Sequence, residues 1–227
     1  MTIQDLKPSE KKEGRWLVFL EDGTILRVGE ADVADLGLYR GMELTPEQAE
    51  ELQNAAALSK LKTKALNILS ARAVSRRELI QKLTARPWRQ AGAEEIAGSD
   101  PEQEREALAV RAEDVADWLE NLGLLNDEQY AKGVVRYCAE KGFGERRIRD
   151  ELFRRGVPRE LWDEALEDRP DSDGAIDRFL AQKLKNWDGD KKELKRVTDA
   201  LARKGFSWSE ISEGLERYEA TMDKSEL

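Results

Sequence analysis

The stretch ELFRRGVP, from Glu151 to Pro158, decides the fold, because the chain repeats its pattern 49 residues later as ALARKGFS, from Ala200 to Ser207. Each copy ends with two basic residues, a glycine, an apolar residue and then a residue that favours the start of a helix. Glycine at this place permits the left-handed backbone with which many helices end. The two copies predict the same turn between two helices, with a period of about fifty residues that is typical of stacked helical units.

Apolar residues spaced by three and four positions extend this pattern into three groups of three amphipathic helices. We expect the first group at residues 60–73, 75–85 and 111–122, the second at 127–141, 144–156 and 159–167, and the third at 173–187, 191–204 and 208–219. The first group also contains a polar, acidic insert at about 87–110. The sequence therefore predicts a mainly α-helical chain in which tandem three-helix repeats form an elongated stack.

The N-terminal residues predict a different structure. The strand-forming runs RWLVFL (15–20) and TILRV (24–28) lie on either side of Asp22-Gly23, which is a strong signal for a β-hairpin. Thr45 and Pro46 then predict the start of a helix. The expected organisation is a flexible N-terminus at 1–14, a small β-hairpin plus helix at 15–58, repeat 1 at 59–123, repeat 2 at 124–169, repeat 3 at 170–220 and a tail at 221–227.

The composition argues against several functional classes. The chain has no histidine, which removes histidine-based acid–base catalysis and histidine metal ligands, and it has no glycine-rich phosphate loop. We therefore predict a protein that is not an enzyme and that uses no cofactor or metal. The single cysteine, Cys138, lies on an apolar helical face and predicts a buried structural thiol. With no secretory or membrane-spanning segment in the sequence, a monomer in the cytoplasm is expected, with no membrane partner.

Charge alternates in step with the predicted repeats. Charged residues make up 37% of the chain, above the roughly 25% of an average protein, and the net charge of −9 is unevenly distributed. The net charge is +7 over residues 60–86, −9 over 87–128, +5 over 129–159, −6 over 160–182, +4 over 183–204 and −4 over 205–227. Each basic block falls on the first and middle helices of a repeat, and each acidic block falls on the third helix and its flanks. Such alternation predicts a partner that is itself repetitive and charged.

The basic residues of the middle helices are the candidate partner-binding positions. Some of them must be solvated or paired within the protein, because neighbouring charges of opposite sign also stabilise a helical stack modestly. Arginine and lysine bind carboxylates and phosphates alike, so these positions leave the chemistry of the partner open. The candidates are Arg76, Arg77 and Lys82 in repeat 1; Arg146, Arg147, Arg149, Arg154 and Arg155 in repeat 2; and Lys191, Lys192, Lys195, Arg196, Arg203 and Lys204 in repeat 3.

Three segments resemble the RecX family, which comprises bacterial regulators of the RecA recombinase. They are SRRELIQKL (75–83), GLLNDEQYAKGVVRYCAEKGFGERRIRDELFRRGVP (123–158) and LARKGFSWSEI (201–211). The resemblance implies a non-enzymatic modulator, expected to be an inhibitor, that binds in the groove of the RecA–single-stranded DNA filament. It also implies that such binding restrains strand exchange, ATP hydrolysis or filament extension, with single-stranded DNA within or beside the partner.

Two other classes of function stay open on the sequence. Three-helix units with a basic middle helix are similar to helix-turn-helix modules, so a direct nucleic-acid-binding protein is the main alternative. The overall acidity argues against simple strong binding to duplex DNA, for which a basic domain is expected. An adaptor with a different protein partner is the third possibility.

Overall fold

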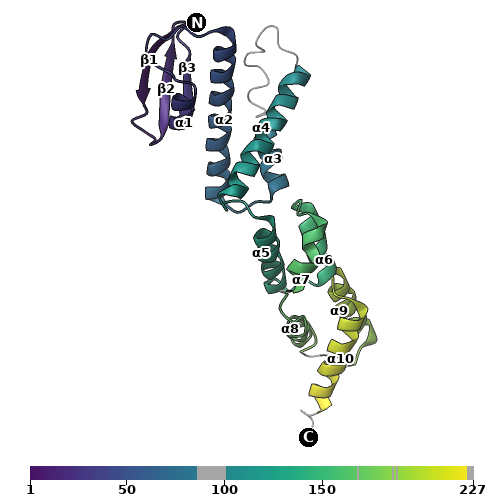
Figure 1. The fold of residues 1–227 in the computed structure, drawn as a ribbon. Coiled ribbons are helices and arrows are strands. Elements are labelled where there is room, and N and C mark those ends of the chain that lie inside the picture. Colours follow the sequence, from purple (N-terminus) through teal and green to yellow (C-terminus); the bar gives the residue numbers. More distant parts are fainter. Residues whose placement is uncertain (86–100, 168, 186, 188, 224–227) are drawn as a thin grey trace. The chain divides into compact units, whose positions relative to one another are not determined.

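The computed structural model describes residues 1–85, 101–167, 169–185, 187 and 189–223. The chain forms two compact units, one made of Met1–Ala73 with Leu79–Leu124, the other of Val74–Glu78 with Leu125–Leu227. Most described residues are helical, and a small sheet lies near the N-terminus (Figure 1). The predicted mainly α-helical fold with a β-containing N-terminal part is therefore confirmed.

The N-terminal sheet has three antiparallel strands in the order β1-β2-β3: β1 (Ile3–Pro8), β2 (Arg15–Leu20) and β3 (Ile25–Gly29). The predicted hairpin is present as β2 and β3. The prediction of a flexible segment at residues 1–14 is wrong, because β1 pairs with β2 and places Ile3 opposite Leu20, where both side chains are buried. A hairpin alone is marginally stable, and the third strand supplies part of the missing apolar contact.

Helices α1 (Glu30–Asp35) and α2 (Pro46–Ala71) complete the N-terminal part. The Thr45 hydroxyl accepts a hydrogen bond from the Gln48 backbone N–H, and the Gln48 side chain accepts one from the Thr45 N–H, so the start of α2 has a complete capping box. Leu52 of α2 packs with Ile3, Val18 and Leu20 in one apolar cluster. The helix continues through Ser59, so the expected boundary between residues 58 and 59 falls inside one uninterrupted helix.

The rest of the first unit is built from α2, from α4 (Pro101–Asn121) and from α3 (Arg76–Thr84), whose first residues, up to Glu78, belong to the second unit. In Figure 1, α4 packs beside α2. The insert expected at 87–110 requires correction, because residues 101–110 are the first turns of α4; residues 87–100 lie outside the described part of the chain. Pro101 stands at the first helical position, and Glu102 and Glu104 lie in the first turn, where negative charge is favourable.

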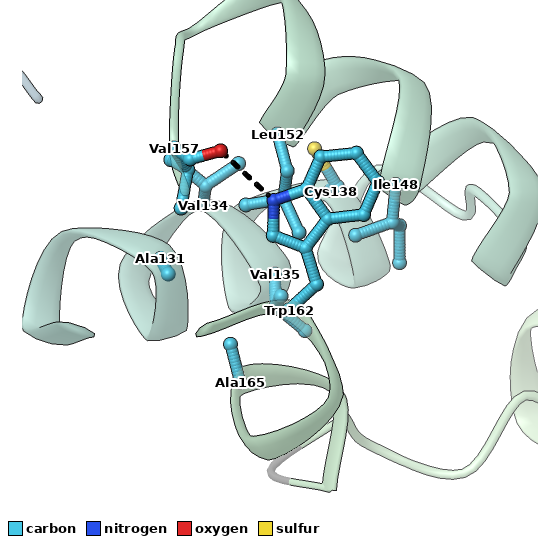
Figure 2. Close-up of a cluster of buried hydrophobic side chains, with 9 residues drawn as sticks. All are labelled: Ala131, Val134, Val135, Cys138, Ile148, Leu152, Val157, Trp162 and Ala165. Atoms are coloured by element: carbon cyan, nitrogen blue, oxygen red, sulfur yellow. Dashed lines mark hydrogen bonds between the residues drawn. The ribbon is translucent and has the colours of Figure 1, made fainter. Parts of the chain in front are cut away.

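The second unit contains two further helix groups. The first of these comprises α5 (Asp127–Glu140), α6 (Glu145–Arg154), the short 3-10 helix η2 (Arg159–Leu161) and α7 (Trp162–Glu167). Its core joins Val135 and Cys138 of α5, Ile148 and Leu152 of α6, and Trp162 of α7 (Figure 2). The indole N–H of Trp162 donates to the carbonyl of Val157 at 3.0 Å, so the one polar atom of this buried ring is satisfied.

The last group comprises α8 (Asp173–Lys183), α9 (Lys191–Arg203) and α10 (Trp208–Asp223). Its core contains Ile176, Leu180, Leu201, Phe206 and Ile211, which lie on the predicted apolar faces or the turn between them. No helix in the described ranges is both long and apolar enough to cross a membrane.

Candidate partner interface

The middle helices α6 and α9 meet end to end in a close joint. The backbone N–H of Gly144 donates to the carbonyl of Lys204 at 2.9 Å, and the N–H of Arg146 donates to the carbonyl of Gly205 at 3.1 Å. Gly205 has a φ of 94°, so it ends α9 in the left-handed conformation that favours glycine. A Cβ atom on Gly144 would overlap the backbone of Gly205, so both glycines are required for this contact.

The same joint recurs where the start of α3 meets the end of α6. The hydroxyl of Ser75 donates to the carbonyl of Arg155, just as Gly144 donates to that of Lys204. Gly156, with a φ of 72°, packs against the hydrocarbon chain of Arg77. The glycines of the repeated stretch therefore serve as helix ends and as docking points for the next middle helix. Their spacing predicts only the first of these roles.

The exposed faces of α6 and α9 carry the same charges in the same order. With the offset of 49 residues that aligns the two helices, four charged positions on α6 have a counterpart of equal sign on α9. All eight side chains are exposed. The pairs are Arg146 and Lys195, Arg147 and Arg196, Asp150 and Asp199, and Arg154 and Arg203. We call these residues the repeated charged face.

Other candidate residues on α6 are used within the protein. Arg149 forms ion pairs with Glu145 at 2.8 Å and with Asp163 of α7 at 2.9 Å. Arg155 is half-buried and donates to Glu151 at 2.8 Å and to the hydroxyl of Tyr130 at 3.2 Å. These two arginines hold their helix group together and are therefore less suited to contact a partner.

The basic residues of α3 differ from those of α6 and α9. Arg76 and Lys82 are half-buried and take part in interactions inside the protein. Arg77 is exposed at its charged end. Where α6 and α9 have Asp150 and Asp199, α3 has the neutral Gln81. The first repeat therefore contributes the joint but not the repeated charged face.

The remaining lysines of α9 and the end of that helix complete the candidate set. Lys191 and Lys192 are exposed in its first turn. Lys204 is half-buried at its C-terminal end, and its ammonium lies 5.4 Å from the ring centroids of both Phe143 and Phe179. Of the fourteen candidates, most of the exposed ones lie on α6 and α9, whereas Arg76, Lys82, Arg149, Arg155 and Lys204 are at least partly buried and interact within the protein.

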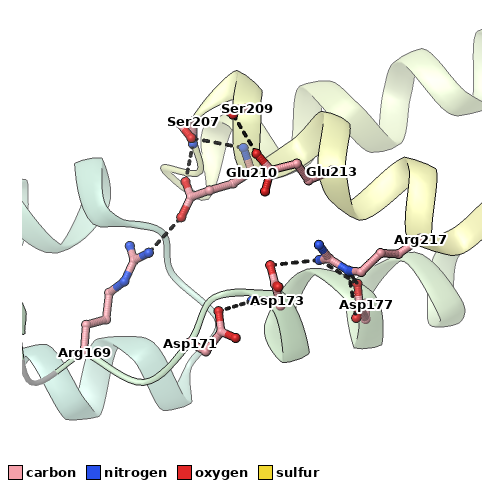
Figure 3. Close-up of polar contacts among 9 residues, drawn as sticks. All are labelled: Arg169, Asp171, Asp173, Asp177, Ser207, Ser209, Glu210, Glu213 and Arg217. Atoms are coloured by element: carbon pink, nitrogen blue, oxygen red, sulfur yellow. Dashed lines mark hydrogen bonds and ion pairs between the residues drawn. The ribbon is translucent and has the colours of Figure 1, made fainter.

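Acidic residues of α8 and α10 are partly neutralised by internal ion pairs (Figure 3). Arg217 of α10 contacts Asp173 at 2.9 Å and Asp177 at 3.0 Å on α8. Glu210 accepts hydrogen bonds from the Ser207 backbone N–H and from Arg169, both at 2.7 Å. Partial burial alone would raise the pKa of Glu210, but these hydrogen bonds outweigh it and lower the pKa to about 2.

One exposed aromatic residue adjoins the repeated charged face and is not identified by the sequence analysis. Phe153 of α6 is 57% exposed and lies three residues after Asp150, on the helix face opposite Ile148 and Leu152. A large apolar side chain among exposed charges is typical of a contact with another macromolecule. Its place between Leu152 and Arg154, off the apolar stripe, is the signal that identifies it.

The fold and the site define a helical-repeat protein, in which three-helix groups are joined through their middle helices and a charged face recurs on α6 and α9. Residues 126–166 match the family model described as RecX, second three-helix domain. The predicted resemblance to the RecX family is therefore confirmed.

Relatives in several bacteria extend this resemblance along the chain. The regulatory protein RecX of Listeria welshimeri is 25% identical over 218 residues, which covers 93% of this chain and 73% of that protein. The regulatory protein RecX of Caldanaerobacter subterraneus is 25% identical over 207 residues, which covers 90% of this chain and 94% of that protein.

Two solved structures share the fold. The first is a crystal structure of regulatory protein RecX, with a TM-score of 0.67 and 20% identity; the match covers 93% of this chain and 98% of that one. The second is the crystal structure of RecX from Lactobacillus salivarius, with a TM-score of 0.59 and 22% identity; it covers 73% of this chain and 99% of that one.

Proposed function

We propose that this protein is a non-enzymatic regulator that binds the filament formed by the RecA recombinase on single-stranded DNA. Binding restrains strand exchange, ATP hydrolysis or filament extension. The relatives carry the name regulatory protein RecX, which supports a regulatory role. The observation that carries the proposal is the repeated charged face, in which α6 and α9 present the same four charges in the same order.

A repeated surface suits a repeated partner. A filament presents the same groups at regular intervals, and two equivalent faces on one protein can engage two neighbouring sites. Once one face is bound, the second meets its site at an effective concentration on the order of millimolar, so two weak contacts give a strong complex. A bridge across neighbouring subunits then opposes the changes in filament geometry that strand exchange and growth require.

The charge order favours a protein surface over a bare phosphate backbone. Asp150 and Asp199 stand among the basic residues of the two faces. A phosphodiester chain would meet these carboxylates with repulsion, whereas a protein surface can supply a lysine or arginine opposite each one. Exposed charge pairs contribute no more than about 1 kcal/mol each, so several pairs and the apolar contact of Phe153 are needed together.

Charge reversal on α6 and α9 tests this function. The assays measure strand exchange and ATP hydrolysis by the cognate recombinase, and the wild-type protein should inhibit both. Half-maximal inhibition should require a concentration at least tenfold higher for each of the variants R146E/R147E and K195E/R196E. The control K183E/K185E makes the same change in net charge at exposed lysines outside the repeated charged face. Lack of inhibition by folded wild-type protein, or equal loss in the control, would contradict the proposal.

Direct nucleic-acid binding is the alternative, and the same variants separate it. A nucleic-acid-binding protein of helix-turn-helix type should bind oligonucleotides without recombinase, with an affinity that falls steeply as salt is raised. The proposal predicts weak binding to DNA alone and strong binding once the filament is present.

A further inference from the structure

A cavity of about 400 Å³ lies between the two helix groups of the second unit. The end of α5, one side of α8 and the end of α9 form its walls. Three cationic side chains line it, with one carboxylate, one amide and one aromatic ring. These residues are Lys141, Arg178, Lys204, Glu140, Gln182 and Phe179. The volume is in the range of small-ligand pockets, which are roughly 300–1,000 Å³.

Among the described residues, the three cationic side chains of this cavity form no ion pair. Lys204 lies against the rings of Phe143 and Phe179, and its ammonium is 3.4 Å from the carbonyl of Gly142. Within the described ranges, neither Lys204 nor Arg178 has a carboxylate at ion-pair distance. The ammonium of Lys141 lies over the ring of Tyr137, 5.5 Å from its centroid.

The equivalent joint at the end of α6 shows how such a cation is normally neutralised. Arg155 occupies the place of Lys204, and Glu151, four residues earlier, accepts its hydrogen bond at 2.8 Å. In α9 the residue four positions before Lys204 is Ala200. The two copies of the repeated stretch thus differ at their first residue, and the difference removes the internal counter-ion from one joint.

The balance of charge in the cavity favours an anion. The helix ends at α5 and α9 contribute about half a negative charge each, and Glu140 contributes one, against three full positive charges. An excess of roughly one positive charge remains. Arginine and lysine together form the usual protein ligands of phosphate. We propose that this cavity binds a phosphate group, carried by a small molecule or by a nucleic-acid strand, in place of the missing carboxylate.

This site stands apart from the proposed regulation of a recombinase, because its test needs only the purified protein and a small anion. Binding of inorganic pyrophosphate is measured by isothermal titration calorimetry at low salt. Wild-type protein should bind pyrophosphate saturably, and R178Q should bind at least about fivefold more weakly, because it removes one charge-assisted contact.

The variant A200E supplies the decisive comparison. It restores the carboxylate that Glu151 provides at the other joint, in the favourable order of glutamate four residues before lysine. It should therefore weaken pyrophosphate binding about tenfold or more while the protein stays folded. The control K183Q changes an exposed lysine of α8 that does not line the cavity, and its affinity should equal that of wild type.

Three results would overturn the proposal: no saturable binding by wild type, unchanged binding by folded A200E and R178Q, or equal weakening in K183Q. A parallel titration with oligothymidylate, with and without a 5′-phosphate, distinguishes the two sources of the phosphate. Binding of pyrophosphate but neither oligonucleotide supports a small-molecule ligand, and A200E-sensitive binding of either oligonucleotide supports a strand.

Discussion

The backbone N–H of Arg146 donates a hydrogen bond to the carbonyl of Gly205, and this bond fixes the start of α6 on the end of α9. Because Arg146 is also the first residue of the repeated charged face, the joint and the candidate partner interface share one turn of helix. At the next joint the hydroxyl of Ser75 donates to the carbonyl of Arg155, which corresponds to the bond between Gly144 and Lys204. The exposed charges are therefore positioned by the contacts that hold the repeats in series.

Replacement of Gly144 by alanine tests the joint. G144A should lower the free energy of unfolding of the second unit by about 2–3 kcal/mol, because the added methyl group overlaps the backbone of Gly205 and forces the helix ends apart. The matched control is G133A in α5, where the added Cβ atom meets nothing within 4 Å. That change should stabilise the helix by about 0.5–1 kcal/mol. Urea denaturation followed by circular dichroism measures the free energy of unfolding of both variants. Equal changes in G144A and G133A would contradict the close contact between Gly144 and Gly205.

The neighbours Arg154 and Arg155 should respond differently to truncation. Arg155 is half-buried and donates to Glu151 and Tyr130, so R155A should cost about 2–3 kcal/mol in stability, because it removes the donor to Tyr130 and leaves Glu151 only the longer contact with Arg154 among the described residues. The side chain of Arg154 is 64% exposed, and R154A should cost less than about 0.5 kcal/mol. Chemical denaturation of the two variants measures the contrast; a reversed order would show that the contacts of Arg155 are not maintained in solution.

The pair of Arg169 and Glu210 should make stability depend on acidity. The pKa of Glu210 is lowered from 4.5 to about 2 in the folded protein, so its carboxylate stabilises the fold above pH 4.5. That contribution should be lost as the pH falls from 4.5 towards 2. In E210Q the free energy of unfolding should be lower at neutral pH and should fall less steeply over this window. If the free energy of unfolding of wild type and of E210Q changed equally with pH between 4.5 and 2, the contribution of Glu210 to the pH dependence of stability would be refuted.

The thiol of Cys138 should be inert in the folded protein. It is 2% exposed in the core of the α5–α7 group, and burial raises its pKa, so little reactive thiolate is available. Labelling by Ellman's reagent at pH 8 should be slow in buffer and immediate in urea. Rapid stoichiometric labelling of native protein would show that this core opens readily.

The sequence predicts the features of the fold that depend on neighbouring residues, but it does not predict those that depend on contacts between distant residues. The helices of the second unit follow from apolar spacing and from the glycines at 156 and 205, since both signals are local. Strand β1 is not predictable in this way, because IQDLKP has little strand character and becomes a strand through pairing with β2. The first turns of α4 are likewise not predictable from the sequence, because residues 101–106 are exposed and therefore show no apolar stripe.

The same distinction between local and long-range features applies to the residues of the candidate partner interface. Charge and helix position identify Arg146 and Arg149 equally well from the sequence. Only the fold distinguishes them, because Asp163 reaches Arg149 from a different helix and leaves Arg146 exposed. The close approach of Gly144 to Gly205 is likewise a contact between distant positions, which spacing along one helix does not encode.

The central claim is that the two copies of the repeated charged face bind the recombinase filament together. Its most direct test is the affinity for recombinase filaments on single-stranded DNA, measured by cosedimentation. The proteins compared are wild type, R146E/R147E, K195E/R196E and the variant that combines all four changes. Two equivalent faces that bind together predict a loss of at least tenfold for either pair and loss of detectable binding for the combined variant, with K183E/K185E unchanged. A folded combined variant that binds the filament as tightly as wild type would contradict the account.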